Sequence, residues 1–481
     1  MDDLESVLTE EASPPFDPTV RRSTHRVSTI LATSTELLVA PQMAGAPPSR
    51  HLYLGRLARF YDAGVDQLPR VLTSEGLDPQ AMVFKRCQHR DQRISKARLW
   101  VFSVPAAPMV IALSLDVHAA MLELIPLLED CYYGDVRQGE DSLAQLALAL
   151  LRRSGVAVNE PEQFHLEPEC HQLVFLSESS TTTEPTDDVL QRLIYRADLD
   201  YRSEHSSIRY PSELNRRPDS LAAIGPFVSV LVTQQDYIEN CAFLSAVHLV
   251  SATAKVRRIR AETYKSLVAV RRLAAEQRAV PEIDGQTRRR SSFARISERL
   301  AEQELELTFG VEGMRRIGLL VPSLRVESYH EQLVDALQLR ENTATVSNML
   351  GRLGTALSAE LDSIRAYDTR REELRRLRWG VTVGMLTTIA VPVGIVLSFF
   401  SGQSSEVKPG ASMFAFSLYR GFYGFLSSLI ILALMVFLYL RRRETRELAK
   451  VAQVKLDEED GASLARALRT RNHTDGVEAS P

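Results

Sequence analysis

The chain has 481 residues, of which 45% are hydrophobic and 25% are charged, so it can bury a sizeable core in more than one domain. Its formal net charge of -4 argues against a general nucleic-acid-binding protein, and we expect no nucleic-acid partner. The cysteines lie far apart and form no C-x-x-C pair, so the sequence suggests neither a zinc ribbon nor a disulfide framework.

Residues 1–24 are acidic and contain proline, which predicts a disordered tail rather than a secretory signal. Residues 25–235 alternate short apolar runs with stretches of helical spacing, which predicts a cytoplasmic α/β domain. The best strand candidates are residues 99–104, 109–115, 173–177 and 227–233, and the best helix candidates are residues 117–133 and 141–153.

After residue 235 the strand signals end. Residues 236–322 are predicted to be helical with a linker near 279–292, and residues 323–379 to form a long stalk helix, because no proline follows Leu324 until Pro392. One face of this stalk carries apolar residues at steps of three and four, which favours coiled-coil-like packing and self-association of the chain. These residues are Val346, Leu350, Leu353, Leu357, Leu361 and Ile364.

Two C-terminal runs carry no charge, from 379 to 400 and from 421 to 440. Each has the length that a helix needs to cross a bilayer, so we expect a transmembrane helix at 380–400, an external loop at 401–420 and a second transmembrane helix at 421–440. Arginines precede the first run and follow the second, which predicts that both termini are cytoplasmic in a multi-pass protein of the cell membrane. Residues 441–481 are expected to form a basic and then disordered cytoplasmic tail. The predicted fold is therefore an α/β cytoplasmic domain followed by a long helical stalk and a two-helix C-terminal transmembrane hairpin in contact with the lipid bilayer.

The first of these runs also has a face of small and weakly polar side chains at steps of three and four. Such a stripe has two physical uses, close packing of helices or the lining of a narrow water-filled path. Its members are Gly380, Gly384, Thr387, Val391, Gly394, Ser398 and Ser401.

No nucleotide-binding loop, dinucleotide fingerprint or nucleophile elbow occurs in the sequence, and we expect no enzyme activity and no cofactor. Residues 164–171 place His165, Glu167, Glu169 and His171 at alternate positions, where a strand could present them to a metal. The alternative is a solvated edge strand or loop, because Pro168 interrupts the run.

The order of a cytoplasmic α/β domain, a long helix, two C-terminal apolar runs and a basic end resembles the CorA family of magnesium and related divalent-cation transporters. Local likeness is concentrated in TTIAVPVGIVLSFF and in GFYG followed by ALMVFLYLRRR. The resemblance implies a homopentamer in which the first membrane helix of each subunit lines the pore. It also implies a mouth at Gly402, Gln403 and Glu406, although Ser401, Gly402 and Gln403 stand where the family has its Gly-Met-Asn signature.

Two hypotheses follow. The first is a CorA-like channel that passes a divalent cation, possibly Mg²⁺, down its electrochemical gradient, with the cation as cargo and not as a bound cofactor. The second is a membrane-tethered cytosolic sensor or scaffold that retains this architecture without transport.

Overall fold

The computed structural model describes residues 23–36, 45–64, 66–85, 93–134, 136–158, 161–176, 187–197, 207–217, 220–233, 235–279, 283–401 and 416–428, and short pieces from there to 442. The chain divides into two compact units, Met1–Leu361 and Asp362–Pro481.

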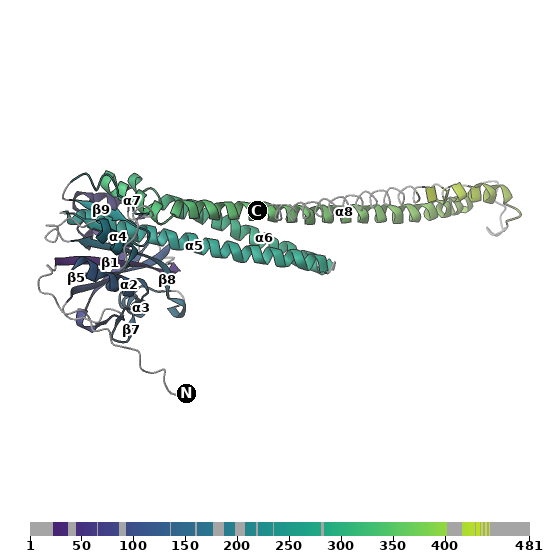
Figure 1. Ribbon diagram of the computed structural model, residues 1–481. Coiled ribbons are helices and arrows are strands. Elements are labelled where there is room, and N and C mark those ends of the chain that lie inside the picture. The colour runs from purple at the N-terminus through teal and green to yellow at the C-terminus, as the bar shows by residue number, and fades with distance from the viewer. Residues whose placement is uncertain are drawn as a thin grey trace, which may run out of the picture. The chain divides into compact units, whose positions relative to one another are not determined.

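A sheet forms the centre of the first unit (Figure 1). It has seven strands in the order β2-β4-β5-β1-β8-β10-β9. Neighbouring strands are antiparallel except for β8 and β10, which are parallel. The strands are β1 (Ser23–Glu36), β2 (Arg70–Leu77), β4 (Ile94–Ser103), β5 (Pro108–Ala119), β8 (Leu166–Leu176), β9 (Leu221–Ile224) and β10 (Val228–Val232). A small second sheet joins β3 (Met82–Val83), β6 (Arg137–Gln138) and β7 (Asp141–Ser142).

One face of the large sheet is apolar because alternate residues of its strands are branched or aliphatic. Val27, Leu113, Leu115 and Val174 are fully buried in this core. The helices packed there are α2 (Ile125–Tyr132), α3 (Leu143–Arg153) and α4 (Asp187–Tyr195), and the short α1 (Ala58–Ala63) precedes β2. The α/β architecture expected from the sequence is thereby confirmed. Single 3-10 turns complete this part of the chain at Pro48–Arg50, Gly55–Leu57, Pro79–Ala81, Met121–Leu124 and Pro161–Gln163.

The other face is covered over part of its length by α5 (Asp236–Ala279), which packs on β1, β5 and β8. Phe102 of β4 meets Phe243 of α5 with ring centroids 5.7 Å apart, and Ser251 Oγ donates a 2.6 Å hydrogen bond to the carbonyl of Pro108. α5 continues past the sheet with α6 (Ile283–Leu305) beside it (Figure 1).

The next helices along the chain are α7 (Leu324–Ala336) and α8 (Leu339–Ser401), preceded by a π-helix, η9 (Glu306–Glu312), and a 3-10 turn, η10 (Ile317–Leu319). The continuous helix expected from Leu324 is divided in two, because Gln338 takes a left-handed φ of 52°. α8 in turn continues through Gly351 and Gly354.

Most of the apolar stripe of the stalk is covered within a single chain. Val346, Leu350, Leu353 and Leu357 are at most 5% exposed, whereas Leu361 and Ile364 are half-buried. The four buried residues therefore need no second copy of the chain to cover them.

The expected membrane hairpin is wrong. Within the part of the chain that the structure describes, no helix is at once long enough and apolar enough to cross a membrane. Absence of charge alone selected residues 380–400 and 421–440, whereas a span also needs high hydropathy sustained over about 20 helical residues. Residues 380–400 form the end of the 63-residue helix α8, and residues 421–440 are described only in pieces. The prediction of a multi-pass membrane protein is corrected by the same finding.

Candidate functional site

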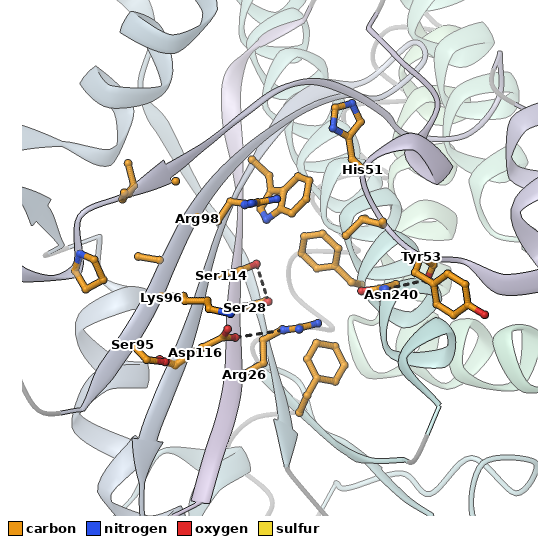
Figure 2. Close-up of a pocket in the computed structure, with 18 residues that line it drawn as sticks. Arg26, Ser28, His51, Tyr53, Ser95, Lys96, Arg98, Ser114, Asp116 and Asn240 are labelled. Carbon is orange, nitrogen blue, oxygen red and sulfur yellow. Dashed lines mark hydrogen bonds and ion pairs between the residues drawn. The ribbon is translucent and has the colours of Figure 1, made fainter.

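A pocket of about 520 Å³ lies at the end of the sheet face that α5 leaves uncovered (Figure 2). β1, β4 and β5 form its floor, the first turns of α5 form one wall, and the segments at 51–53 and 76–79 form the rim. The polar side chains in it are Arg26, Ser28, His51, Tyr53, Ser95, Lys96, Arg98, Ser114, Asp116 and Asn240.

Strand register explains why these side chains meet. Arg26 of β1 and Lys96 of β4 are both paired with Asp116 of β5, so the three form one row across the sheet. Two residues further along, Ser28 and Arg98 are both paired with Ser114 and form a second row. Because side chains two apart on a strand share a face, both rows point into the pocket.

The next two rows in the same register are apolar. Ile30, Ala112 and Trp100 form the third row, and Ala32, Val110 and Phe102 form the fourth. All six are at most 5% exposed. The three strands therefore change from polar to apolar together, at the point where α5 begins to cover them.

Positive charge predominates in the pocket, because three cations and one carboxylate line it. Arg26 is held loosely, with Nε 3.5 Å from Asp116 Oδ1 and Nη1 3.8 Å from Glu239 Oε2. Lys96 and Arg98 have no carboxylate within ion-pair distance among the described residues. Their charges are therefore available to a ligand.

The back of the pocket is aromatic. Trp100 stacks on Phe102 with centroids 6.2 Å apart and meets the edge of Phe243 at 6.4 Å, and the Arg98 guanidinium lies 5.2 Å from the Trp100 ring centroid. The indole Nε1 of Trp100 is buried and has no hydrogen-bond partner within the described structure. A buried donor without a partner is uncommon, and here it belongs to a residue that lines the pocket.

The rim joins the pocket to the start of α5. Asn240 Nδ2 donates a 2.9 Å hydrogen bond to the backbone carbonyl of Tyr53, and Ser28 and Ser114 share a 2.9 Å hydroxyl contact on the floor (Figure 2). His51 faces the edge of Trp100 at 6.5 Å. Partial burial and the nearby Arg98 and Arg50 lower the pKa of His51, so its ring is neutral at pH 7.

Glu239 lies on α5 next to this site, with its side chain only 13% exposed. Burial, opposed by Arg26 and assisted by Asp236 and Asp116, raises the pKa of Glu239 to about 7. Glu239 therefore changes charge near neutral pH.

The metal hypothesis for residues 164–171 is not supported. Glu169 is held by Arg257 at 2.7 Å, and His171 is fully buried, with Nε2 2.8 Å from Ser229 Oγ. His165 and Glu167 lie 3.8 Å apart at the exposed start of β8. No cluster of three or more potential metal ligands occurs among the described residues.

The residues predicted to line a pore all lie on α8 and are exposed or half-buried. Thr387 Oγ1 donates to the carbonyls of Val383 and Gly384, and Ser401 Oγ donates to Ser398 O, so these hydroxyls are satisfied by their own helix. A Cβ added at Gly380, Gly384 or Gly394 would meet no described atom within 4 Å. The predicted mouth residues Gly402, Gln403 and Glu406 lie outside the described residues.

Sequence reasoning missed the pocket, although a signal was present. Lys96 and Arg98 alternate with Ala97 and Leu99 immediately before the apolar run that predicted a strand. A period of two extended backwards through these residues places both cations on one face.

Comparisons with known proteins add little. No protein-family model matches the sequence, and no curated protein matches it. A solved structure described as the full-length CmaX protein is similar over 58% of this chain and 92% of its own, at 16% identity and a TM-score of 0.23. This weak likeness carries no argument about the family or the activity of the chain.

Proposed function

We propose that the first unit is a sensory module that binds a small anion in the pocket on β1, β4 and β5 and passes the binding event to α5. The observation that carries this proposal is the pair of cations Lys96 and Arg98, which have no ion-pair partner among the described residues and lie side by side on adjacent rows of the sheet. This proposal keeps the sensor hypothesis from the sequence and leaves out its membrane tether.

An anion fits the donors of the pocket. Guanidinium and ammonium groups form their strongest hydrogen bonds with carboxylate, sulfate or phosphate oxygens, and the hydroxyls of Ser28, Ser114 and Ser95 can donate as well. A volume of about 520 Å³ lies in the range typical of small-molecule sites. Because the donors stand on a sheet and not on a loop, the site is largely formed before a ligand arrives.

A sensory role is supported by α5. Its second turn supplies Asn240 and Phe243 to the pocket, and the same helix then continues to Ala279. A ligand that shifts the rim or Arg26 therefore acts directly on α5, a single helix that extends beyond the sheet. Self-association of the chain, expected from the sequence, would let such a signal pass between copies.

Transport of a divalent cation, the activity that the CorA resemblance implies, stays a hypothesis from the sequence. The excess of positive charge in the pocket favours anions over cations as its ligand.

Isothermal titration calorimetry with sulfate and with pyrophosphate tests the proposal. The unmodified chain should bind at least one of these probes, and Lys96→Gln and Arg98→Gln should each weaken binding by about tenfold, the effect of losing one charge-assisted hydrogen bond of about 1.5 kcal/mol.

Arg59→Gln is the matched control. Arg59 is exposed and stacks over Phe60 outside this pocket, so its loss should leave the affinity unchanged. Absence of binding by the unmodified chain, or equal losses from the control and the pocket variants, would contradict the proposal.

A further inference from the structure

Arg26 stands between two carboxylates that come from different elements. Asp116 approaches its Nε from the neighbouring strand at 3.5 Å, and Glu239 approaches its Nη1 from α5 at 3.8 Å. Both distances are longer than the 2.7–2.9 Å of a well-formed charge-assisted hydrogen bond. The guanidinium is therefore shared by two partners and is tightly bound by neither.

The two carboxylates differ in their surroundings. The Asp116 side chain is 26% exposed and lines the pocket beside Lys96, whereas that of Glu239 is 13% exposed and sits at the start of α5. A charged Glu239 is therefore the less well hydrated of the two. Its ionised form depends on Arg26, the nearest cation that faces it.

An anion in the pocket competes for the same cation. If Arg26 turns its charge towards a bound sulfate or phosphate oxygen, Glu239 loses its compensating charge and gains a negative neighbour. Both changes favour the protonated carboxyl. By reciprocity, protonation of Glu239 frees Arg26 and strengthens binding of the anion.

We propose that anion binding in the pocket on β1, β4 and β5 is coupled to uptake of one proton by Glu239, which makes Glu239 the residue that sets the pH dependence of the site. This inference rests on the proposed function. It adds that the module responds both to the anion and to pH, since Glu239, the group that takes up the proton, lies on α5.

The groups that face Glu239 from the packed elements are consistent with this assignment. Arg26 comes from β1, Asp116 from β5 and Asp236 from the first turn of α5. The two aspartates disfavour the charged form of Glu239, and Arg26 alone of the three favours it. His51, at the rim, is a further group at the pocket that could gain a proton, and burial together with Arg98 and Arg50 lowers its pKa.

Sulfate is the suitable probe, because its charge stays constant around neutral pH. Titration calorimetry of the full chain should show sulfate affinity falling by about fivefold or more between about pH 6 and about pH 8, within the range of ordinary coupling energies. In Glu239→Gln the carboxamide mimics the neutral form, so the affinity should be high and nearly the same at both pH values. His51→Gln is the matched control and should keep the pH dependence of the unmodified chain.

A second readout does not depend on any variant. Binding enthalpies of the unmodified chain measured near pH 7 in buffers of different ionisation enthalpy give the number of protons taken up, which should be clearly positive and at most about one per sulfate. Sulfate binding that is independent of pH, without proton uptake, would overturn the coupling and leave the proposed function standing. A flat pH profile in His51→Gln would reassign the proton to His51. If pyrophosphate binds but sulfate binds at neither pH, the coupling is overturned and the proposed function stands. If neither probe binds, the proposed function is overturned as well.

Discussion

Arg26 of β1 lies directly across the sheet from Asp116 of β5, and their side chains approach to 3.5 Å between Nε and Oδ1. Six residues further along β1, Ala32 is paired with Val110 in the same register, and both are fully buried. One pair of strands therefore provides a polar site at one end and a dry core at the other. The start of α5 separates these two environments.

The apolar end should dominate stability. Phe102→Ala removes a fully buried ring that packs on Trp100 and Phe243, and we expect it to lower the free energy of unfolding by about 3–5 kcal/mol in urea denaturation. Phe309→Ala, at a position that is 74% exposed, is the matched control and should cost far less. Similar losses from the two variants would contradict this assignment of the core.

Lys255 of α5 joins the sheet to the π-helix. Its side chain is 3% exposed, and its ammonium lies 2.9 Å from Glu36 Oε1 and 2.7 Å from Glu306 Oε2. Lys255→Met keeps the length of the side chain and leaves two carboxylates without this partner, so the free energy of unfolding should fall by about 3 kcal/mol. Lys265→Met, at an exposed position of the same helix, should change it by less than about 0.5 kcal/mol. A stable Lys255→Met protein would show that the network does not hold these elements together.

His330 should make the fold sensitive to acid. It is fully enclosed between Ser245 Oγ at 2.7 Å and the Met314 carbonyl at 2.9 Å, and burial lowers its pKa to about 4 from 6.5. In the unfolded chain His330 binds a proton first as pH falls, so protons favour unfolding, and stability is lost between about pH 6.5 and about pH 4.

The measurement is the free energy of unfolding as a function of pH. In His330→Gln its slope over this range should decrease by about one proton. An unaltered slope in the His330 variant would contradict the neutral buried state of this ring.

Gly225 joins β9 to β10 where a side chain has no room. A Cβ at this position would collide with Ile194 Cγ2 and lie 3.3 Å from the Val228 carbonyl, so Gly225→Ala should destabilise the chain by about 1–3 kcal/mol in thermal or urea unfolding. Gly313→Ala provides the comparison, because its Cβ would meet nothing within 4 Å. Equal stability of the two variants would show that the turn adapts without cost.

The sequence predicted those strands that are apolar on both faces. The run at 109–115 became the middle of β5, and the run at 227–233 became β10, because continuous Val, Leu and Ile mark a strand buried between layers. β1 was not predicted, since Ser, Thr and His at positions such as 24, 25 and 28 weaken the pattern. Its pairing with β5 and β8 nevertheless makes it the central strand of the sheet.

The sequence carried a local signal of the pocket in the alternation of Lys96 and Arg98, but the complete pocket depends on strand register. Arg26, Lys96 and Asp116 are distant in sequence, and only the pairing of β1 and β4 with β5 brings them into one row. The uncharged run at the end of α8 instead predicted a membrane span, which the described helices do not bear out.

The most direct test of the account is a crystal structure of the full chain grown with selenate, whose selenium is located by anomalous scattering. The account predicts a selenate in the pocket with oxygen atoms about 2.7–3.2 Å from the Lys96 ammonium and the Arg98 guanidinium, and loss of this signal in the Lys96→Gln and Arg98→Gln double variant. An empty pocket at a selenate concentration that occupies other surface sites, or a signal that persists in the double variant, would contradict it.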